Sequence, residues 1–297
     1  MEDKMKKAVV LFLVLAGFVC LAVAEDVKPD ISVAAPAASD ESAAVKEEGW
    51  KKPVLTGGIN LSQAGFNNWV AGGENSLAWQ AVVDASADYV GTIKWSNKLK
   101  IRYGQITTDS AGTRKSDDEI RLDTMGEYNT GIPVNPFVSL MIQTQVMPGY
   151  DYSSGKIEIS RFMDPGYIKE SVGAALSLGD MLVVKGGAAI KHTIAPVYSL
   201  RYNGSEDADV KSELGAVLTA DFNAKIMENL LFKSGAEMFT NFMGFESIDA
   251  KLDSTLTAKI NEFVNVNFNI VLMYDRDLSK AMQLKESLSI GITYNFL

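Results

Sequence analysis

Polar and apolar residues alternate along most of this chain with a period of two. Such a period is typical of β-strands whose two faces lie in different surroundings. Strands in soluble proteins centre on five or six residues, whereas these segments are long enough to cross a bilayer at a tilt. Twelve segments carry the pattern: 53–62, 76–89, 93–104, 117–129, 136–148, 166–178, 182–195, 210–222, 229–241, 248–260, 263–275 and 284–296.

The two faces of these segments differ in charge. In segment 76–89, Trp79, Val83 and Tyr89 alternate with Asp84 and Asp88. A Lys or Arg side chain on a lipid-facing position costs about 2–4 kcal/mol at mid-bilayer, so we assign the apolar face to lipid and the charged face to a lumen. The predicted lumen charges are Asp84, Asp88, Lys94, Lys98, Lys100, Arg102, Arg121, Asp123, Glu127, Lys185, Lys191, Glu213, Asp221, Lys233, Glu237, Lys251, Asp253 and Lys259.

Parity also suggests how the first two of the charged segments pair. With Tyr89 opposite Ile93, Asp88 would face Lys94 and Asp84 would face Lys98. Each cross-strand pair would contribute at most about 0.2–1 kcal/mol. A twelve-stranded barrel filled with such pairs leaves a narrow path or none.

Long and short connections alternate between the segments. The short ones are 90–92, 130–135, 179–181, 223–228 and 261–262, and the long ones include 62–75, 105–116, 149–165 and 196–209. This alternation indicates short periplasmic turns and long extracellular loops. We therefore predict an all-β fold: a transmembrane, antiparallel, up-and-down β-barrel of about 12 strands with both termini in the periplasm. The alternative is a soluble lipocalin-like barrel or a sandwich, which would not need strands this long.

The last segment ends in a distinctive way. Leu288, Ile290 and Ile292 continue the alternation into Tyr294 and Phe296, one residue before the C-terminus. This ending resembles the terminal recognition strand of bacterial outer-membrane β-barrels. The resemblance implies an assembly signal made by Gly291, Tyr294 and Phe296, read by the barrel-assembly machinery. The final aromatic is penultimate here, because Leu297 follows it.

The N-terminus predicts export. A basic start is followed by an apolar run from Ala8 to Leu21 and by the small-x-small sequence 22–24, which indicates a signal peptide cleaved after Ala24. The alternatives are a transmembrane anchor, for which the run is short, and a lipoprotein acylated at Cys20. Residues 25–49 are rich in Ala, Pro, Ser and acidic residues and predict a disordered periplasmic leader. The barrel is then expected to occupy residues 50–297.

Composition argues against several kinds of partner and site. The formal net charge is -9, which argues against nucleic acid as a partner. Cleavage would remove Cys20, the single cysteine, and His192 is the single histidine, so we expect no metal site and no cofactor. The acidic residues Asp117, Asp118, Glu119, Glu206, Asp207 and Asp209 could bind Ca²⁺, but their spacing matches no calcium loop, and we interpret them as solvated charge. Outer-membrane lipids are the expected surroundings of a monomeric barrel.

A glycine-rich motif connects the first two strands. Its residues are Ser62, Gln63, Phe66, Asn68, Trp69, Gly72 and Gly73, in the pattern SQxxFxNWxxGG, and the run from Arg114 to Asp118 follows later. Together they resemble a family of bacterial outer-membrane β-barrels known as a domain of unknown function. The resemblance covers most of the chain from Trp50 and implies location and fold. We interpret the motif as a self-packed outer loop, with a loop folded into the barrel mouth or binding a glycan or partner as the alternative.

Three residues could meet on the outer surface. Ser212, His192 and Glu170 share the lipid-facing parity near the same rim, and they are the inventory of a nucleophile, a base and an orienting acid. The placement resembles that of the outer-membrane phospholipase, but the His-x-Ser motif of that enzyme is absent, because Thr193 and Ile194 follow His192. We expect polar residues above the bilayer rather than an enzyme.

The sequence therefore predicts location better than activity. The first functional hypothesis is a narrow pore or passive transporter with a charged lumen. The alternative is a non-conducting structural or ligand-binding barrel that acts through its extracellular loops. A rim-located lipid hydrolase is a third hypothesis.

Overall fold

A computed structural model describes residues 48–153, 155–179, 181–244, 248–276, 279 and 281–297. The predicted signal peptide, 1–24, and the leader up to residue 47 lie outside the described residues. Gly49 was assigned to the disordered leader, but it pairs with Val90, and Trp50 pairs with Tyr89. The short strand β1 (Gly49–Trp50) therefore extends the ordered chain by one residue toward the N-terminus.

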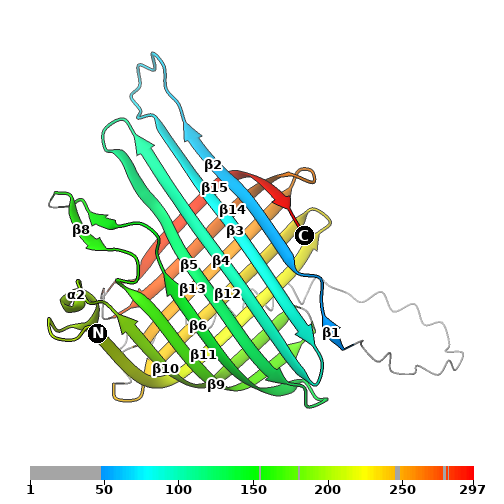
Figure 1. Ribbon diagram of the computed structural model, residues 1–297. Coiled ribbons are helices and arrows are strands. Elements are labelled where there is room, and N and C mark those ends of the chain that lie inside the picture. Colours follow the sequence, from blue (N-terminus) through cyan, green and yellow to red (C-terminus); the bar gives the residue numbers. More distant parts are fainter. Residues whose placement is uncertain (1–47, 154, 180, 245–247, 277–278, 280) are drawn as a thin grey trace, which may run out of the picture. The chain divides into compact units, whose positions relative to one another are not determined.

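The predicted twelve-stranded antiparallel barrel is confirmed (Figure 1). Each strand of the ring pairs with the next, and β15 pairs with β2 to close it. Apart from β1, the elements are β2 (Val54–Ala64), β3 (Ser76–Val90), β4 (Ile93–Thr108), β5 (Gly112–Tyr128), β6 (Val134–Thr144), β7 (Gly149–Asp151), β8 (Ile157–Ser160), β9 (Gly166–Leu178), β10 (Leu182–Ile194), α2 (Ser199–Asn203), β11 (Val210–Met227), β12 (Leu230–Asn241), β13 (Ile248–Lys259), β14 (Val264–Asp275) and β15 (Gln283–Asn295).

The apolar faces of the strands point out of the barrel. Val138, Leu218 and Leu288 are 55%, 43% and 61% exposed, although they lie near the middle of long strands. A soluble barrel would bury this face, and such a continuous exposed band needs lipid around it. Within the described residues no helix is long and apolar enough to cross a membrane.

Aromatic side chains gather where the strands meet the short turns. Trp50 lies against Tyr89, with ring centroids 5.6 Å apart, and Tyr294 stacks on Phe263 at 6.2 Å and contacts Phe296 at 5.0 Å. Amphipathic rings at one edge of an apolar band are typical of a membrane interface.

The two ends of the barrel differ as the connection lengths predicted, with one exception. Residues 105–116 were predicted to form a long loop, but β4 and β5 continue through them to a turn at 109–111. Gly112, which follows the turn, has a φ of +65°. This stretch is polar on both faces, so it suits a two-stranded ribbon wetted on both sides rather than a membrane strand. The connections 145–165 and 195–209 hold the β7–β8 hairpin and α2 (Figure 1).

The predicted register of β3 and β4 was wrong by two residues. Tyr89 pairs with Trp95 rather than Ile93, and Asp84 pairs with Lys100 rather than Lys98. An even shift keeps every side chain on its own face, so the assignment of faces survives it. The expected Asp84–Lys98 and Asp88–Lys94 pairs are replaced by Arg102 with Asp84, at 2.7 Å, and Lys94 with Glu127, at 3.0 Å.

A group of asparagines facing the lumen reinforces the backbone pairing of β15 with β2 that closes the barrel. Asn267 donates to the side chain of Asn60 on β2 at 3.1 Å, and Asn265 donates to Thr293 at 2.9 Å. Gly291 of the terminal strand lies among them and pairs with both Asn265 and Asn60. The asparagines can approach because this position has no side chain.

We expect Gly291→Ala to weaken closure. A Cβ at this position would lie 2.6 Å from Asn60 Oδ1, 2.9 Å from Asn267 Nδ2 and closer still to Asn265. These amide groups can move aside only by giving up hydrogen bonds such as that from Asn267 to Asn60, each worth about 0.5–1.5 kcal/mol. The folded band should convert to the unfolded band at a lower temperature in a heat-modifiability gel. Gly235→Ala is the matched control, because its Cβ would meet nothing closer than Asp221 at 3.7 Å. Equal conversion temperatures for the two variants would refute this role of Gly291.

Candidate functional site

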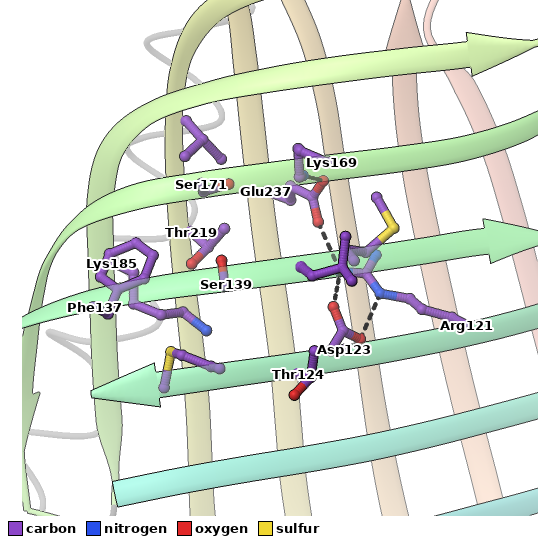
Figure 2. Close-up of a pocket in the computed structure, with 14 residues that line it drawn as sticks. Arg121, Asp123, Thr124, Phe137, Ser139, Lys169, Ser171, Lys185, Thr219 and Glu237 are labelled. Atoms are coloured by element: carbon purple, nitrogen blue, oxygen red, sulfur yellow. Dashed lines mark hydrogen bonds and ion pairs between the residues drawn. The ribbon is translucent and has the colours of Figure 1, made fainter. Parts of the chain in front are cut away.

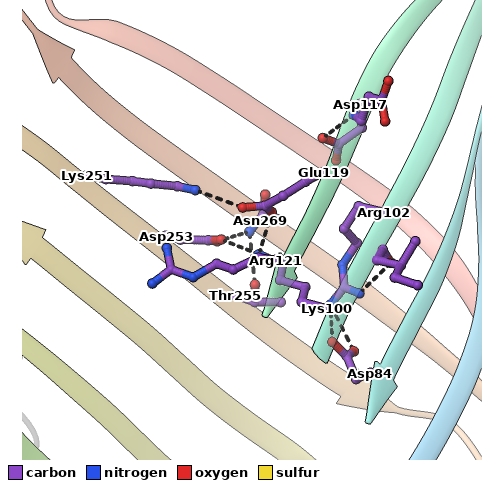
Figure 3. A network of polar contacts seen from close by, with 12 residues as sticks. Asp84, Lys100, Arg102, Asp117, Glu119, Arg121, Lys251, Asp253, Thr255 and Asn269 are labelled. Atoms are coloured by element: carbon purple, nitrogen blue, oxygen red, sulfur yellow. Dashed lines mark hydrogen bonds and ion pairs between the residues drawn. The ribbon is translucent and has the colours of Figure 1, made fainter. Parts of the chain in front are cut away.

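Ion pairs cross the lumen between opposite walls at mid-height (Figure 3). Lys100 on β4 contacts Asp253 on β13 at 3.1 Å, and Lys251 on β13 contacts Glu119 on β5 at 3.4 Å. Strands β5 and β13 are six positions apart in a ring of twelve, the largest separation possible. Lys100 also contacts Glu119 at 3.2 Å, so these four side chains form one connected layer.

A second link crosses beside the first. Arg121 on β5 holds Asp123 at 2.8 Å and reaches Glu237 on β12, five strands away, at 3.0 Å. Lys169 on β9 contacts the other oxygen of Glu237 (Figure 2). We call the eight residues of both links the constriction: Lys100, Glu119, Arg121, Asp123, Lys169, Glu237, Lys251 and Asp253. Long side chains meeting from opposite walls fill the barrel at this level.

A polar cavity of about 660 Å³ lies in the lumen next to the constriction, toward the short turns. Thr56, Lys98 and Lys233, close to the short-turn ends of their strands, line it. Six cations and six anions contribute to its wall: Lys98, Lys100, Arg121, Lys185, Lys233 and Lys251 against Asp84, Glu119, Asp123, Asp221, Glu237 and Asp253. The cavity wall is therefore charged but carries no formal net charge.

Most of the predicted lumen charges line the cavity or form ion pairs with residues of other strands. Asp84, Lys98, Lys100, Arg121, Asp123, Lys185, Asp221, Lys233, Glu237, Lys251 and Asp253 line the cavity. Of the others, Asp88 lies opposite Ser96 and Lys259 opposite Asn265, Lys94 and Glu127 pair near the short turns, and Arg102 pairs with Asp84. Lys191 pairs with Glu213 and Asp249 near the long-loop end.

Several lumen residues were not predicted from the sequence. Lys169, Asp249 and Lys285 are further inward charges; Lys285 contacts Asp117 across the lumen at 2.8 Å. The asparagines Asn265, Asn267 and Asn269 were also missed, although their spacing of two residues was visible. Asn269 donates to Asp253 at 2.8 Å and so supports the constriction.

The acidic residues considered for Ca²⁺ do not gather. Asp117 and Glu119 lie on the inward face of β5, where Lys285 and Lys251 neutralise them, and Asp118 is held by Lys115 at 2.9 Å. Their interpretation as solvated loop charge was wrong for these residues, because they lie within β5 and are paired with lysines. No group of three or more His, Cys, Asp or Glu side chains suited to a metal occurs among the described residues.

The long-loop end carries its own packed structure. The carboxylate of Asp164 is buried and accepts hydrogen bonds from the backbone N–H of Val197, at 2.8 Å, and of Tyr198. Tyr202 of α2 donates to the carbonyl of Ile159 at 3.1 Å. The connections 145–165 and 195–209 therefore support each other over β9 and β10.

The glycine-rich motif forms a loop tied to the β4–β5 turn. Asn75 donates to Asp109 at 2.8 Å, and the N–H of Ser110 donates to Glu74 at 2.6 Å. Hydrogen bonds from Ser110 hold the pKa of Glu74 below its usual value, so this tie persists at neutral pH. Gly73 lies against the ring of Phe66, where a Cβ would clash.

The other motif residues lie at the exposed side of this loop. Gly72 has a φ of +85° and Asn68 one of +54°, which are conformations that suit Gly and Asn. Trp69 is 63% exposed, and its neighbour Val70 is fully exposed. Ser62 and Gln63 belong to the end of β2. The loop is thus self-supported at its base and apolar at its tip.

Ser212, His192 and Glu170, which share the lipid-facing parity in the sequence, lie close together in the structure. His192 Nδ1 lies 2.7 Å from Ser212 Oγ, and His192 Nε2 lies 3.3 Å from a carboxylate oxygen of Glu170. His192 and Ser212 are direct partners across β10 and β11, while Glu170 is one step diagonal on β9. All three side chains lie on the outer face, near the long-loop ends of their strands.

Two family models match separate parts of the chain. Residues 61–150 match "Protein of unknown function (DUF3078)", and residues 178–296 match "Protein of unknown function, DUF481". The first range contains the glycine-rich motif. No curated protein matches the sequence.

Solved structures of similar architecture are distant in sequence. The translocator domain of the autotransporter NalP from Neisseria meningitidis is 10% identical, with 85% of this chain and 90% of that chain covered and a TM-score of 0.38. An outer membrane channel from Pseudomonas putida F1 is 8% identical, with 88% and 99% covered and a TM-score of 0.38. OmpT, an outer membrane protein of Vibrio cholerae, is 9% identical, with 83% and 97% covered and a TM-score of 0.31. The strand pairing of this chain alone therefore carries the description of its fold.

Proposed function

We propose that this protein is a narrow outer-membrane channel, a passive path for small hydrophilic solutes. The observation that carries the proposal is the polar cavity of about 660 Å³ inside the barrel, bounded by ion pairs between opposite walls. A purely structural barrel could fill its lumen with apolar or small residues, whereas this one keeps an unfilled space with charged walls.

The charge balance of the cavity suggests what it would pass. Because six cations face six anions, the wall offers no net field to concentrate ions of one sign. Neutral and zwitterionic solutes of small size fit such a path best. We expect little preference between K⁺ and Cl⁻.

The location proposed for the channel is the cell outer membrane, after export through a cleaved signal peptide. The lipid-facing band, the terminal aromatic strand and the closed ring support this location and a monomer that needs no second chain to complete its sheet. Gly291, Tyr294 and Phe296 remain the proposed signal for the barrel-assembly machinery. The short turns would then face the periplasm and the long loops the exterior.

Conductance of the refolded wild-type protein in a planar bilayer tests the function. In about 0.1 M KCl the Debye length is about 10 Å, so we expect brief, infrequent openings; in about 1 M KCl it is about 3 Å, and we expect screening to lengthen them. A reversal potential near zero in a KCl gradient would support the balanced wall. No openings at any voltage or salt concentration would refute the channel.

The second candidate is a non-conducting barrel that binds a ligand through its outer loops. One observation favours it: Trp69 and Val70 are exposed at the tip of a loop whose base is held by Asn75 and Glu74. A rigid loop that presents an exposed aromatic ring is typical of recognition surfaces. This candidate remains if the bilayer experiment shows no openings.

A further inference from the structure

We propose that Ser212, His192 and Glu170 form a hydrolytic site for acyl esters of membrane lipids on the outer face of the barrel. The proposal is independent of conduction through the lumen. It rests on two observations: the close contacts of His192 with Ser212 and Glu170, and an apolar groove that Glu170 lines.

The arrangement assigns a role to each residue. A carboxylate oxygen of Glu170 lies 3.3 Å from His192 Nε2, and its assigned role is to favour the neutral ring that carries its proton on Nε2 and its lone pair on Nδ1. Nδ1 faces Ser212 Oγ at 2.7 Å and can accept its proton. A nucleophile, a base within hydrogen-bond reach and an acid that orients the base are the three side chains of a catalytic triad for acyl transfer.

The three strands hold this geometry firmly. His192 and Ser212 face each other in a regular antiparallel register, and Glu170 reaches the ring from the strand on the other side. The side chains of His192 and Glu170 are 32% and 51% exposed, so a molecule in the surrounding lipid can approach them. A buried structural triad would not offer this access.

An apolar groove of about 600 Å³ runs along the outer face from this group. Glu170 lines it, together with Ile190 and Leu214. Ile190 and Leu214 are two residues from His192 and Ser212 on the same faces, which is about 7 Å along a strand. The groove therefore starts at Glu170, about 7 Å along the strand from the serine, and continues toward the membrane interior.

Small residues make the groove hollow. Ala188 and Gly126 lie in its wall, with Val138, Val172 and Trp95 around them. Because this face is surrounded by lipid, its natural occupant is an acyl chain. A chain lying in the groove would bring its ester carbonyl to the polar rim, where Ser212 stands.

The reaction would proceed in two balanced steps. Ser212 Oγ attacks the ester carbonyl while its proton passes to His192, the bond to the alcohol oxygen breaks, and His192 returns the proton to the leaving alcohol. Water then gives a proton to His192 and attacks the acyl-serine. The fatty acid leaves, and the proton returns to Ser212.

The test uses the folded, full-length barrel in vesicles of phosphatidylethanolamine and phosphatidylglycerol, with release of free fatty acid as the readout. We expect Ser212→Ala and His192→Gln to lower the rate by about 10²–10⁴-fold, toward that of vesicles without protein. Thr240→Ala is the matched control, a hydroxyl removed from the outer face of the adjacent strand β12; it should leave the rate unchanged.

Two further measurements separate catalysis from folding. A fluorophosphonate should add its mass to Ser212 in the heat-modifiable, folded form only, and His192→Gln should suppress this labelling. Glu170 is a positioning residue. Glu170→Gln should therefore lower kcat and leave KM unchanged, because the amide keeps the shape of the groove. Equal fatty-acid release by wild type and Ser212→Ala, with Ser212 unlabelled, would overturn the proposal and leave the three residues as a polar link between strands.

Discussion

The variant Lys100→Ser/Arg121→Ser/Glu237→Ser/Asp253→Ser should show discrete, long-lived conductance steps where the wild type shows brief ones. These substitutions remove two of the contacts that join opposite walls, Lys100 with Asp253 and Arg121 with Glu237, and leave the longer contact of Lys251 with Glu119 in place. Two cations and two anions are lost, so the net charge of the lumen is unchanged. Any increase in conductance would therefore result from a wider path and not from a change in the electrostatic potential of the lumen.

The structure also explains why this variant should still fold. Glu119 keeps Lys251, and water that enters the widened lumen can hydrate Lys169, which loses Glu237. The backbone ladder that closes the barrel is untouched. Heat-modifiable migration of the variant would establish this before the bilayer measurement.

Lys185→Ser/Asp221→Ser is the matched control. It also removes one cation and one anion from the cavity wall, which are paired at 3.0 Å. Because β10 and β11 are adjacent strands, this pair does not cross the lumen. Single-channel records should match those of the wild type. If the four-serine variant and this control behave alike, the constriction does not limit the path.

The strands could be predicted because their signal is local. Alternation of two residues placed β9 at 166–178, as found, and placed β14 within one residue of Val264–Asp275. The same parity separated the lipid face from the lumen face. It needs no knowledge of which strands are neighbours, since each strand carries its own pattern.

The register and the lumen contacts depend on more than parity. The turn at Gly91 and Thr92 decides that Tyr89 meets Trp95, and alternation is blind to a shift of two residues. Contacts between β5 and β13 depend on the diameter and shear of the closed barrel. No short-range pattern could pair Glu119 with Lys251, which lie on opposite sides of it.

The group of Ser212, His192 and Glu170 shows a second limit of prediction from the sequence. Parity placed Ser212, His192 and Glu170 on one face near one rim, and the absence of a His-x-Ser motif argued against a site. The pairing of β9, β10 and β11 brings the three together across strands, so a motif along one strand is not required. The groove beside them depends on side chains from six strands and has no signature in the sequence.

Glu237→Gln should be the most destabilising single substitution in the constriction. Lys169 contacts Glu237 with a side chain that is only 6% exposed, so loss of the carboxylate leaves a nearly buried ammonium without its counter-ion. Removing one partner of a buried pair costs about 3–5 kcal/mol, and we expect the lower end because Glu237 itself retains some contact with the cavity. Arg121 adds less to the loss, since Asp123 still holds it.

Urea unfolding in lipid vesicles, followed by tryptophan fluorescence, measures this loss as a change in the free energy of unfolding. Asp221→Asn is the control: its carboxylate is 44% exposed in the same cavity, and its pair with Lys185 should contribute about 0–1 kcal/mol. The double variant Lys169→Met/Glu237→Gln should recover most of the loss, because no unpaired charge remains at that point. Similar stabilities for Glu237→Gln and Asp221→Asn would mean that water reaches Lys169 freely, and the constriction would then be too loose to close the lumen.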